Sequence, residues 1–114
     1  MVVEVRASRS QPDVSVVSLS GRLDLEAVEA DSPALLQALQ QSAAGIIVDL
    51  GGVEFISSSG LRMLLAADGD AQGSGKRVAL VRAQPSVYKI FKVAGLGPKF
   101  RFFDDENAAV QALW

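Results

Sequence analysis

The sequence contains no cysteine and no histidine, and these two absences exclude much of the common chemistry of enzyme sites. Without cysteine there are no disulfides, thiolate nucleophiles or cysteine-ligated metals. Without histidine, the usual general base near neutral pH and a frequent metal ligand are missing. We therefore expect a protein that works by binding, with no catalytic residue, metal or cofactor of its own.

Strong charge and long apolar runs are also absent. The net charge is −2, from 11 basic and 13 acidic residues, so nothing global attracts nucleic acid or an anionic membrane. No apolar run approaches the ~20 residues of a membrane span, and the N-terminus, MVVEVRASRS, is too polar for a secretory signal. We expect one cytoplasmic domain over residues 1–114, a monomer or weak dimer, that neither binds nucleic acid nor inserts into a membrane.

What the sequence does contain is a predicted buried strand followed directly by a helix, between residues 44 and 65. Residues 46–50 form a short apolar run that is typical of a central strand covered on both faces. Leucines at helical spacing follow at positions 61, 64 and 65. The segment between the strand and these leucines consists of small residues: Ser57, Ser58, Ser59 and Gly60.

Such a strand-to-helix junction has distinct chemistry. The first N–H groups of a helix have no intrahelical partner and carry the positive end of the macrodipole. One serine is enough to cap them. Gly60 leaves room for close approach by another backbone, a phosphate or a partner protein. The serines are therefore candidate site residues, with simple helix capping as the alternative.

The remaining elements predict an α/β fold. Residues 2–6 and 14–20 read as an antiparallel strand pair that Gly21 ends. The first helix begins either at Ser32, with Pro33 in its first turn, or earlier, near Asp24. The predicted order then continues with helix 61–67, strand 78–81, a helix from Pro85, strand 100–103 and helix 106–113. This order predicts a mixed sheet of four to five strands with parallel inner strands and about four helices.

The glycine-rich segment 68–76 invites comparison with a phosphate-binding P-loop. A Walker motif ending at Gly75-Lys76 would need glycine where Asp70 stands and serine or threonine where Arg77 stands. The segment also follows a helix instead of a strand. We interpret it as a flexible helix-to-strand connection.

Taken together, these segments resemble the STAS domain family, and most closely the bacterial anti-sigma factor antagonists. The resemblance covers nearly the whole chain. It is carried chiefly by Gly21-Arg22-Leu23-Asp24, Ile47-Val48-Asp49-Leu50, Ser58-Ser59-Gly60-Leu61 and Pro85 with Gly95-Leu96. The resemblance implies a single STAS-like domain.

The resemblance also implies a phosphorylation site. In that family the first serine of an Asp-Ser-Ser/Thr-Gly-Leu pattern is phosphorylated by a partner that is both anti-sigma factor and ATP-dependent kinase. Carried over by position, the phosphoacceptor is Ser58, and Ser59 and Gly60 match as they stand. The aspartate position is Ser57, a departure that weakens the case for phosphorylation and adds a second hydroxyl that could be modified instead. Asp24, otherwise a loop or cap residue, matches a position associated with the same partner surface.

The mechanism implied by the resemblance is an exchange of partners. The unmodified protein docks its Ser58 surface on the kinase and releases the sigma factor, and the phosphorylated protein lets go. The kinase supplies ATP and Mg²⁺, and a serine phosphatase would reset the switch.

Arg62 adds one hypothesis that comes from spacing alone. It lies four residues after Ser58, on the same helix face, where its guanidinium could pair with a phosphate. A solvated arginine is the alternative. The predicted partner-binding residues are therefore Asp24, Ser57, Ser58, Ser59, Gly60 and Arg62.

Two other interpretations stay open. A STAS domain without a phosphoswitch could serve as a scaffold or accessory subunit, for example in a phospholipid transport complex. The serine at position 57, where the family pattern has aspartate, is consistent with this alternative. A serine hydrolase is disfavoured, because Ile56 stands where a Gly-x-Ser-x-Gly motif around Ser58 needs its first glycine. No lysine has a spacing that argues for a Ser/Lys pair.

Overall fold

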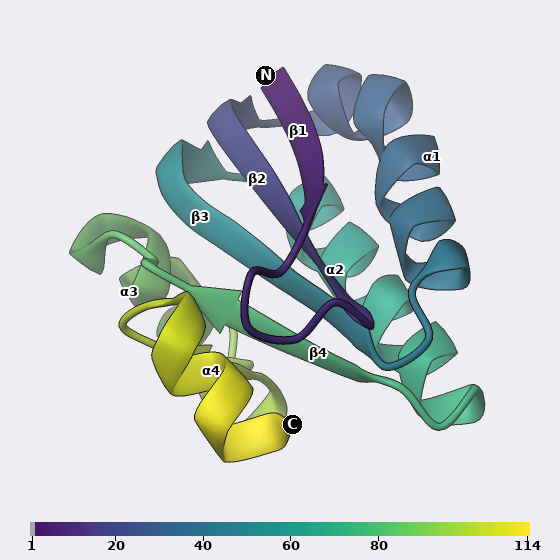
Figure 1. Ribbon diagram of the computed structural model, residues 1–114. Coiled ribbons are helices and arrows are strands. Elements are labelled where there is room, and N and C mark those ends of the chain that lie inside the picture. Colours follow the sequence, from purple (N-terminus) through teal and green to yellow (C-terminus); the bar gives the residue numbers. More distant parts are fainter. Residues whose placement is uncertain (1) are drawn as a thin grey trace.

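The computed structural model describes residues 2–114, and its centre is a five-stranded sheet in the order β1-β2-β3-β4-β5 (Figure 1). The strands are β1 (Val2–Ala7), β2 (Val14–Leu23), β3 (Gly45–Ile56), β4 (Arg77–Val81) and β5 (Arg101–Phe103). β1 pairs with β2 in antiparallel fashion, and the other three pairings are parallel. The predicted mixed sheet with parallel inner strands is confirmed.

Four α-helices cover the two faces of this sheet. They are α1 (Leu25–Gln41), α2 (Ser58–Gly73), α3 (Pro85–Val93) and α4 (Glu106–Leu113), and a short 3-10 helix spans Gly97–Lys99. The first three each connect one parallel strand to the next, and they share one hydrophobic core. Crossovers of the same hand between neighbouring strands place their helices on the same face of the sheet. α4 packs on the opposite face. In Figure 1 α2 lies behind the sheet, α1 lies to its right and α4 lies in front. No helix within residues 2–114 is long and apolar enough to cross a membrane.

β3 is the central strand and is buried on both faces. Ile46, Val48 and Leu50 belong to the core beneath α1, α2 and α3, whereas Ile47 belongs to the core beneath α4. All four side chains are fully buried. The sequence prediction of a doubly covered strand is therefore confirmed.

β2 extends further than the sequence suggested. The predicted end at Gly21 is wrong, because the strand continues to Leu23. Gly21 adopts φ 89°, a left-handed conformation that glycine accepts without strain, and the register shifts between Gly21 and Arg22. The bulge lets β2 stay paired with the last residues of β3, which brings Leu23 next to Ile56.

α1 begins at the earlier of the two predicted positions. Asp24 is its N-cap, and its Oδ1 accepts a hydrogen bond from the N–H of Ala27 at 3.0 Å. The alternative start at Ser32 is wrong, since Pro33 lies inside the helix. Pro33 is exposed, so water can satisfy the carbonyl that its missing N–H would otherwise have bonded.

The segment after residue 67 is helical where the sequence suggested a flexible connection. α2 continues to Gly73, because Asp68 and Ala71 are buried and the Gln72 amide donates to the Asp68 carboxylate at 2.9 Å. Lys76 also has a structural role. Its Nζ donates to the carbonyls of Leu39 and Gln40, at 2.8 and 3.2 Å, and so caps the last turn of α1.

The end of the chain is fastened to the amino-terminal edge of the parallel strands. The Trp114 indole N–H donates to the Ala44 carbonyl at 3.0 Å, and the Arg77 guanidinium donates to the Leu113 carbonyl at 2.8 Å. These bonds hold α4 against the sheet at the opposite end of β3 from residues 57–62.

Candidate functional site

The junction between β3 and α2 is built around Ser57, the N-cap of α2. Its hydroxyl accepts from the N–H of Gly60 at 3.3 Å and donates to the carbonyl of Leu23 at 2.9 Å. Its backbone N–H donates to the same carbonyl at 2.9 Å. The Ser57 hydroxyl is thus occupied as a helix cap that ties α2 to the end of β2.

Ser58 presents a different environment one residue later. It is the first residue of α2 and is exposed. Its Oγ accepts from the Arg62 guanidinium at 3.3 Å, and its carbonyl accepts from Arg62 Nε at 3.4 Å. The proximity expected from the spacing of Ser58 and Arg62 is confirmed. Within residues 2–114 no carboxylate lies within salt-bridge distance of Arg62.

Gly60 faces the interior of the protein. A Cβ at this position would lie 2.7 Å from Ile56 Cγ1 and 3.0 Å from the carbonyl oxygen of Leu23. The close backbone approach expected at Gly60 is therefore made by the end of β2, and the buried residue is not part of the exposed surface. Because Gly60 has no side chain, the first turn of α2 can pack closely on Leu23.

Ser59 and Arg62 line a groove of about 370 Å³ between α1 and α2, together with Val28, Ser32, Leu36, Met63 and Ala66. Beside the junction, the half-buried Asp24 caps α1, and the following Leu25 is 59% exposed. The Leu23 carbonyl joins the two helix starts, because it precedes Asp24 and binds Ser57. The structure therefore brings the predicted residues together at one edge, with Gly60 alone turned inward.

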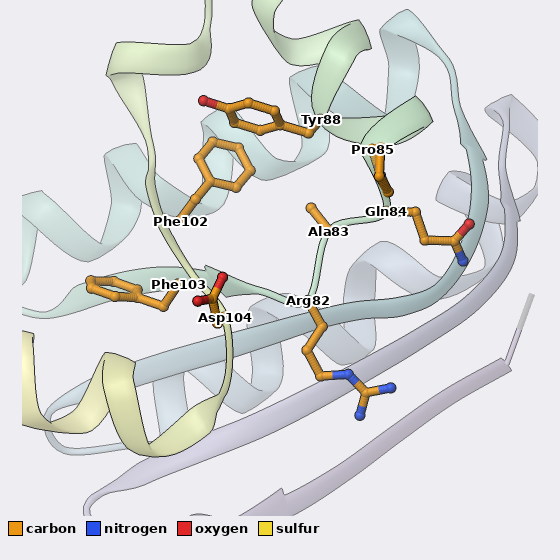
Figure 2. A pocket seen from close by; sticks show the side chains of 8 residues that line it. All are labelled: Arg82, Ala83, Gln84, Pro85, Tyr88, Phe102, Phe103 and Asp104. Carbon is orange, nitrogen blue, oxygen red and sulfur yellow. The ribbon is translucent and has the colours of Figure 1, made fainter.

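A second cleft, of about 580 Å³, lies where β4 and β5 end, and Figure 2 shows its lining residues. Tyr88 and Phe102 meet edge to face in it, with ring centroids 4.9 Å apart. Arg82 and Gln84 turn their polar ends away from this aromatic pair (Figure 2). Gln84 donates to the Gly51 carbonyl at 2.9 Å, and Arg82 lies 3.6 Å from the Asp49 carboxylate.

This cleft was not predictable from the sequence, since its walls come from two separate segments whose aromatic residues look like core. It shares no residue with the β3–α2 junction. Within residues 2–114 no three acidic side chains come together as a metal site. At the junction, by contrast, the exposed Ser58 hydroxyl lies beside the guanidinium of Arg62.

Comparison of the sequence with known proteins identifies its family. The family model described as "Mlab, STAS domain" matches residues 7–100. The chain belongs to the STAS domain family. An anti-sigma F factor antagonist of Lysinibacillus sphaericus is 32% identical to it over 94 residues, which cover 82% of this chain and 80% of the relative.

Solved STAS structures share the whole architecture. The anti-sigma factor antagonist SpoIIAA in its unphosphorylated form matches with a TM-score of 0.78 and 26% identity, over 97% of this chain and 96% of that one. The Bacillus cell fate determinant SpoIIAA in the phosphorylated form matches with a TM-score of 0.71 and 25% identity, over 97% and 99%. The predicted STAS fold is therefore confirmed.

Proposed function

We propose that this STAS protein is an anti-sigma factor antagonist that binds a kinase-type anti-sigma factor through the β3–α2 junction and so releases a sigma factor in the cytoplasm. The observation that carries the proposal is the contrast between adjacent hydroxyls. Ser58 is exposed at the first position of α2, whereas Ser57 is fully engaged as the cap. The names of the STAS relatives support the same function.

The surface around Ser58 supports binding of a protein partner. Leu25 and the groove between α1 and α2 offer apolar area, and Asp24, Ser59 and Arg62 surround it with polar groups. Apolar contacts encircled by polar ones are typical of protein interfaces. A kinase docked here would cover the starts of α1 and α2 together.

In the proposed switch this chain supplies only the acceptor hydroxyl. The Oγ of Ser58 attacks the γ-phosphorus of ATP bound with Mg²⁺ in the kinase, and the bond from phosphorus to the bridging oxygen of ADP breaks. A base of the kinase takes the hydroxyl proton. A serine phosphatase reverses the change by hydrolysis to serine and inorganic phosphate. The protein itself is a regulator and not an enzyme.

Phosphorylation at this place would release the partner. A phosphoserine adds about −1.5 to −2 charges and three hydrated oxygens to a surface that must lose water on docking. Like charges or a desolvated anion in an interface cost several kcal/mol, and every ~1.4 kcal/mol changes affinity tenfold. A single phosphate is therefore sufficient for an off state.

The test is incubation with ATP, Mg²⁺ and the kinase-type anti-sigma factor encoded nearest to the gene, followed by intact-mass and peptide analysis. We expect one phosphate, absent from Ser58→Ala and retained in Ser59→Ala, the matched control one residue away. A phosphate that persists in Ser58→Ala would contradict Ser58 as the acceptor.

A second candidate function is a scaffold or accessory role without phosphorylation. Two observations favour it: the matching family model is described as "Mlab, STAS domain", and Ser57 stands where the phosphorylated relatives' pattern has aspartate. A stable complex with the anti-sigma factor and no phosphate would indicate a binding module without the switch. Neither complex nor phosphate would favour the accessory role, for example in phospholipid transport.

A further inference from the structure

We propose that Arg62 is a counterion built into the switch, a positioning residue that holds the phosphate of phosphorylated Ser58 against the start of α2. This inference rests on the proposed function, because it concerns the regulation of the same site. It assigns to Arg62 a role in the phosphorylated protein that is separate from contact with the partner.

The first support is the geometry of the unmodified site. Two different nitrogens of the Arg62 guanidinium already contact Ser58, Nη2 at the hydroxyl oxygen and Nε at the carbonyl. A phosphate on Oγ would place its oxygens beside this planar set of donors, which suits phosphate better than a lysine ammonium does. No backbone rearrangement is needed to begin the contact.

The second support is the charge around the site. In the described part of the chain, residues 2–114, no carboxylate lies within salt-bridge distance of Arg62. Asp24 caps α1, and Glu26 and Asp31 line a depression with Arg22 that includes neither Ser58 nor Arg62. Ser57 puts a hydroxyl where the family pattern has a carboxylate. The first turn of α2 contains no acidic residue, so Arg62 remains available for the phosphate.

The third support is a precedent within the same molecule. Glu106 is the first residue of α4, as Ser58 is of α2, and its carboxylate accepts hydrogen bonds from the Arg6 guanidinium and the Ser8 hydroxyl. The Arg6 hydrogen bond lowers the pKa of Glu106. This fold thus already holds one anion at a helix start with an arginine. Phosphorylation of Ser58 would produce the same pairing at α2.

The experiment uses the full chain with phosphoserine incorporated at position 58 during translation, so that it does not depend on any kinase. The second ionisation of the phosphate is followed by ³¹P NMR during a pH titration. Removing the guanidinium in Arg62→Gln should raise that pKa by about 0.15 to 0.4 unit, the size expected for an exposed pair four residues apart on a helix. Arg62→Lys should give a smaller rise.

The matched control is Arg22→Gln, which removes the same charge from an arginine whose guanidinium lies over the Phe55 ring, 4.5 Å from its centroid. A screened charge that makes no hydrogen bond to Ser58 should move the phosphate pKa by less than about 0.1 unit. High salt should shrink the effect of Arg62→Gln.

Equal titration of the parent and Arg62→Gln phosphoproteins would overturn the proposal, and so would an equal shift in Arg22→Gln. Thermal melts of the unphosphorylated variants show that each is folded before it is titrated. Failure here would leave the kinase experiment on Ser58 unaffected, so the two proposals fail separately.

Discussion

The starts of α2 and α4 share a capping geometry and differ in the charge of the residue that follows the cap. Each helix is capped by a side-chain oxygen that accepts from the N–H three residues later: Ser57 from Gly60 in α2, and Asp105 from Ala108 in α4 at 2.8 Å. The next residue is the neutral, exposed Ser58 in α2 and the ionised Glu106 in α4. A helix start favours negative charge, and of these two helices α4 carries one in its first turn whereas α2 does not.

This difference separates a structural helix start from one suited to regulation. The Glu106 carboxylate is enclosed by Arg6, Ser8 and the N–H of Arg9, which fasten α4 to the first strand and the loop after it. At α2 the cap and the glycine contact Leu23, while the first position stays exposed. The exposed Ser58 hydroxyl is accessible to a modifying enzyme, as the proposed switch requires.

The largest effect should come from filling the space at Gly60. Gly60→Ala places a methyl group against Ile56 and the Leu23 carbonyl, and we expect a loss of about 2 kcal/mol of unfolding free energy from overpacking. Urea denaturation followed by circular dichroism measures it. The equivalent position of α4 is Ala108, and Ala108→Gly is the control, with an expected cost of at most about 1 kcal/mol from helix propensity. Equal losses of unfolding free energy in Gly60→Ala and Ala108→Gly would contradict the tighter packing inferred at Gly60.

A smaller loss is expected when the cap of α2 is removed. Ser57→Ala deletes the acceptor for Gly60 and one donor to Leu23, and should cost about 1 kcal/mol by the same measurement. Ser58→Ala deletes the neighbouring exposed hydroxyl and should cost less than about 0.5 kcal/mol. A larger loss of unfolding free energy for Ser58→Ala than for Ser57→Ala would show that Ser58, and not Ser57, is the stabilising cap.

The smallest effect concerns the charge at the start of α4. Glu106→Gln should cost about 0.5 kcal/mol at neutral pH, because Arg6 is 47% exposed and solvent screens the pair. The folded-state pKa of Glu106 is lowered, chiefly by the Arg6 hydrogen bond, so its stabilisation is complete above the ordinary value of 4.5. It disappears as the pH falls from there through the lowered pKa.

Urea midpoints of the parent and Glu106→Gln should therefore converge in acid. Unphosphorylated Arg62→Gln serves as the α2 counterpart. The difference in urea midpoint between Arg62→Gln and the parent should stay constant over the same pH range, since no acidic residue occupies the first turn of α2. A convergence in acid for Arg62→Gln would show that a carboxylate is coupled to this arginine after all.

Local features of the site were predictable from the sequence. Capping by a serine, the helix that follows it and the meeting of Ser58 with Arg62 all depend on residues at most four apart. The order of strands and helices was predictable for a similar reason, because periodicity and turn residues are local signals. β3 could be recognised as buried on both faces from its near-continuous apolar run alone.

The features that the sequence did not predict depend on distant contacts. The role of Gly60 is set by Leu23 and that of Glu106 by Arg6, which is 100 residues away in sequence. The extension of β2 past Gly21 depends on pairing with the end of β3. The helix over residues 68–73 persists because burial of Asp68 and Ala71 outweighs the low helix propensity of Gly69 and Gly73.

The attachment of Trp114 to Ala44 has a practical consequence for spectroscopy. Trp114 is the single tryptophan of the chain, and its indole is hydrogen-bonded at the amino end of β3, whereas Ser58 follows the carboxyl end. Its emission should therefore report detachment of α4 and global unfolding, and remain unchanged by phosphate at Ser58. Intrinsic fluorescence thus provides an unlabelled optical readout that separates loss of the fold from loss of switching in every variant.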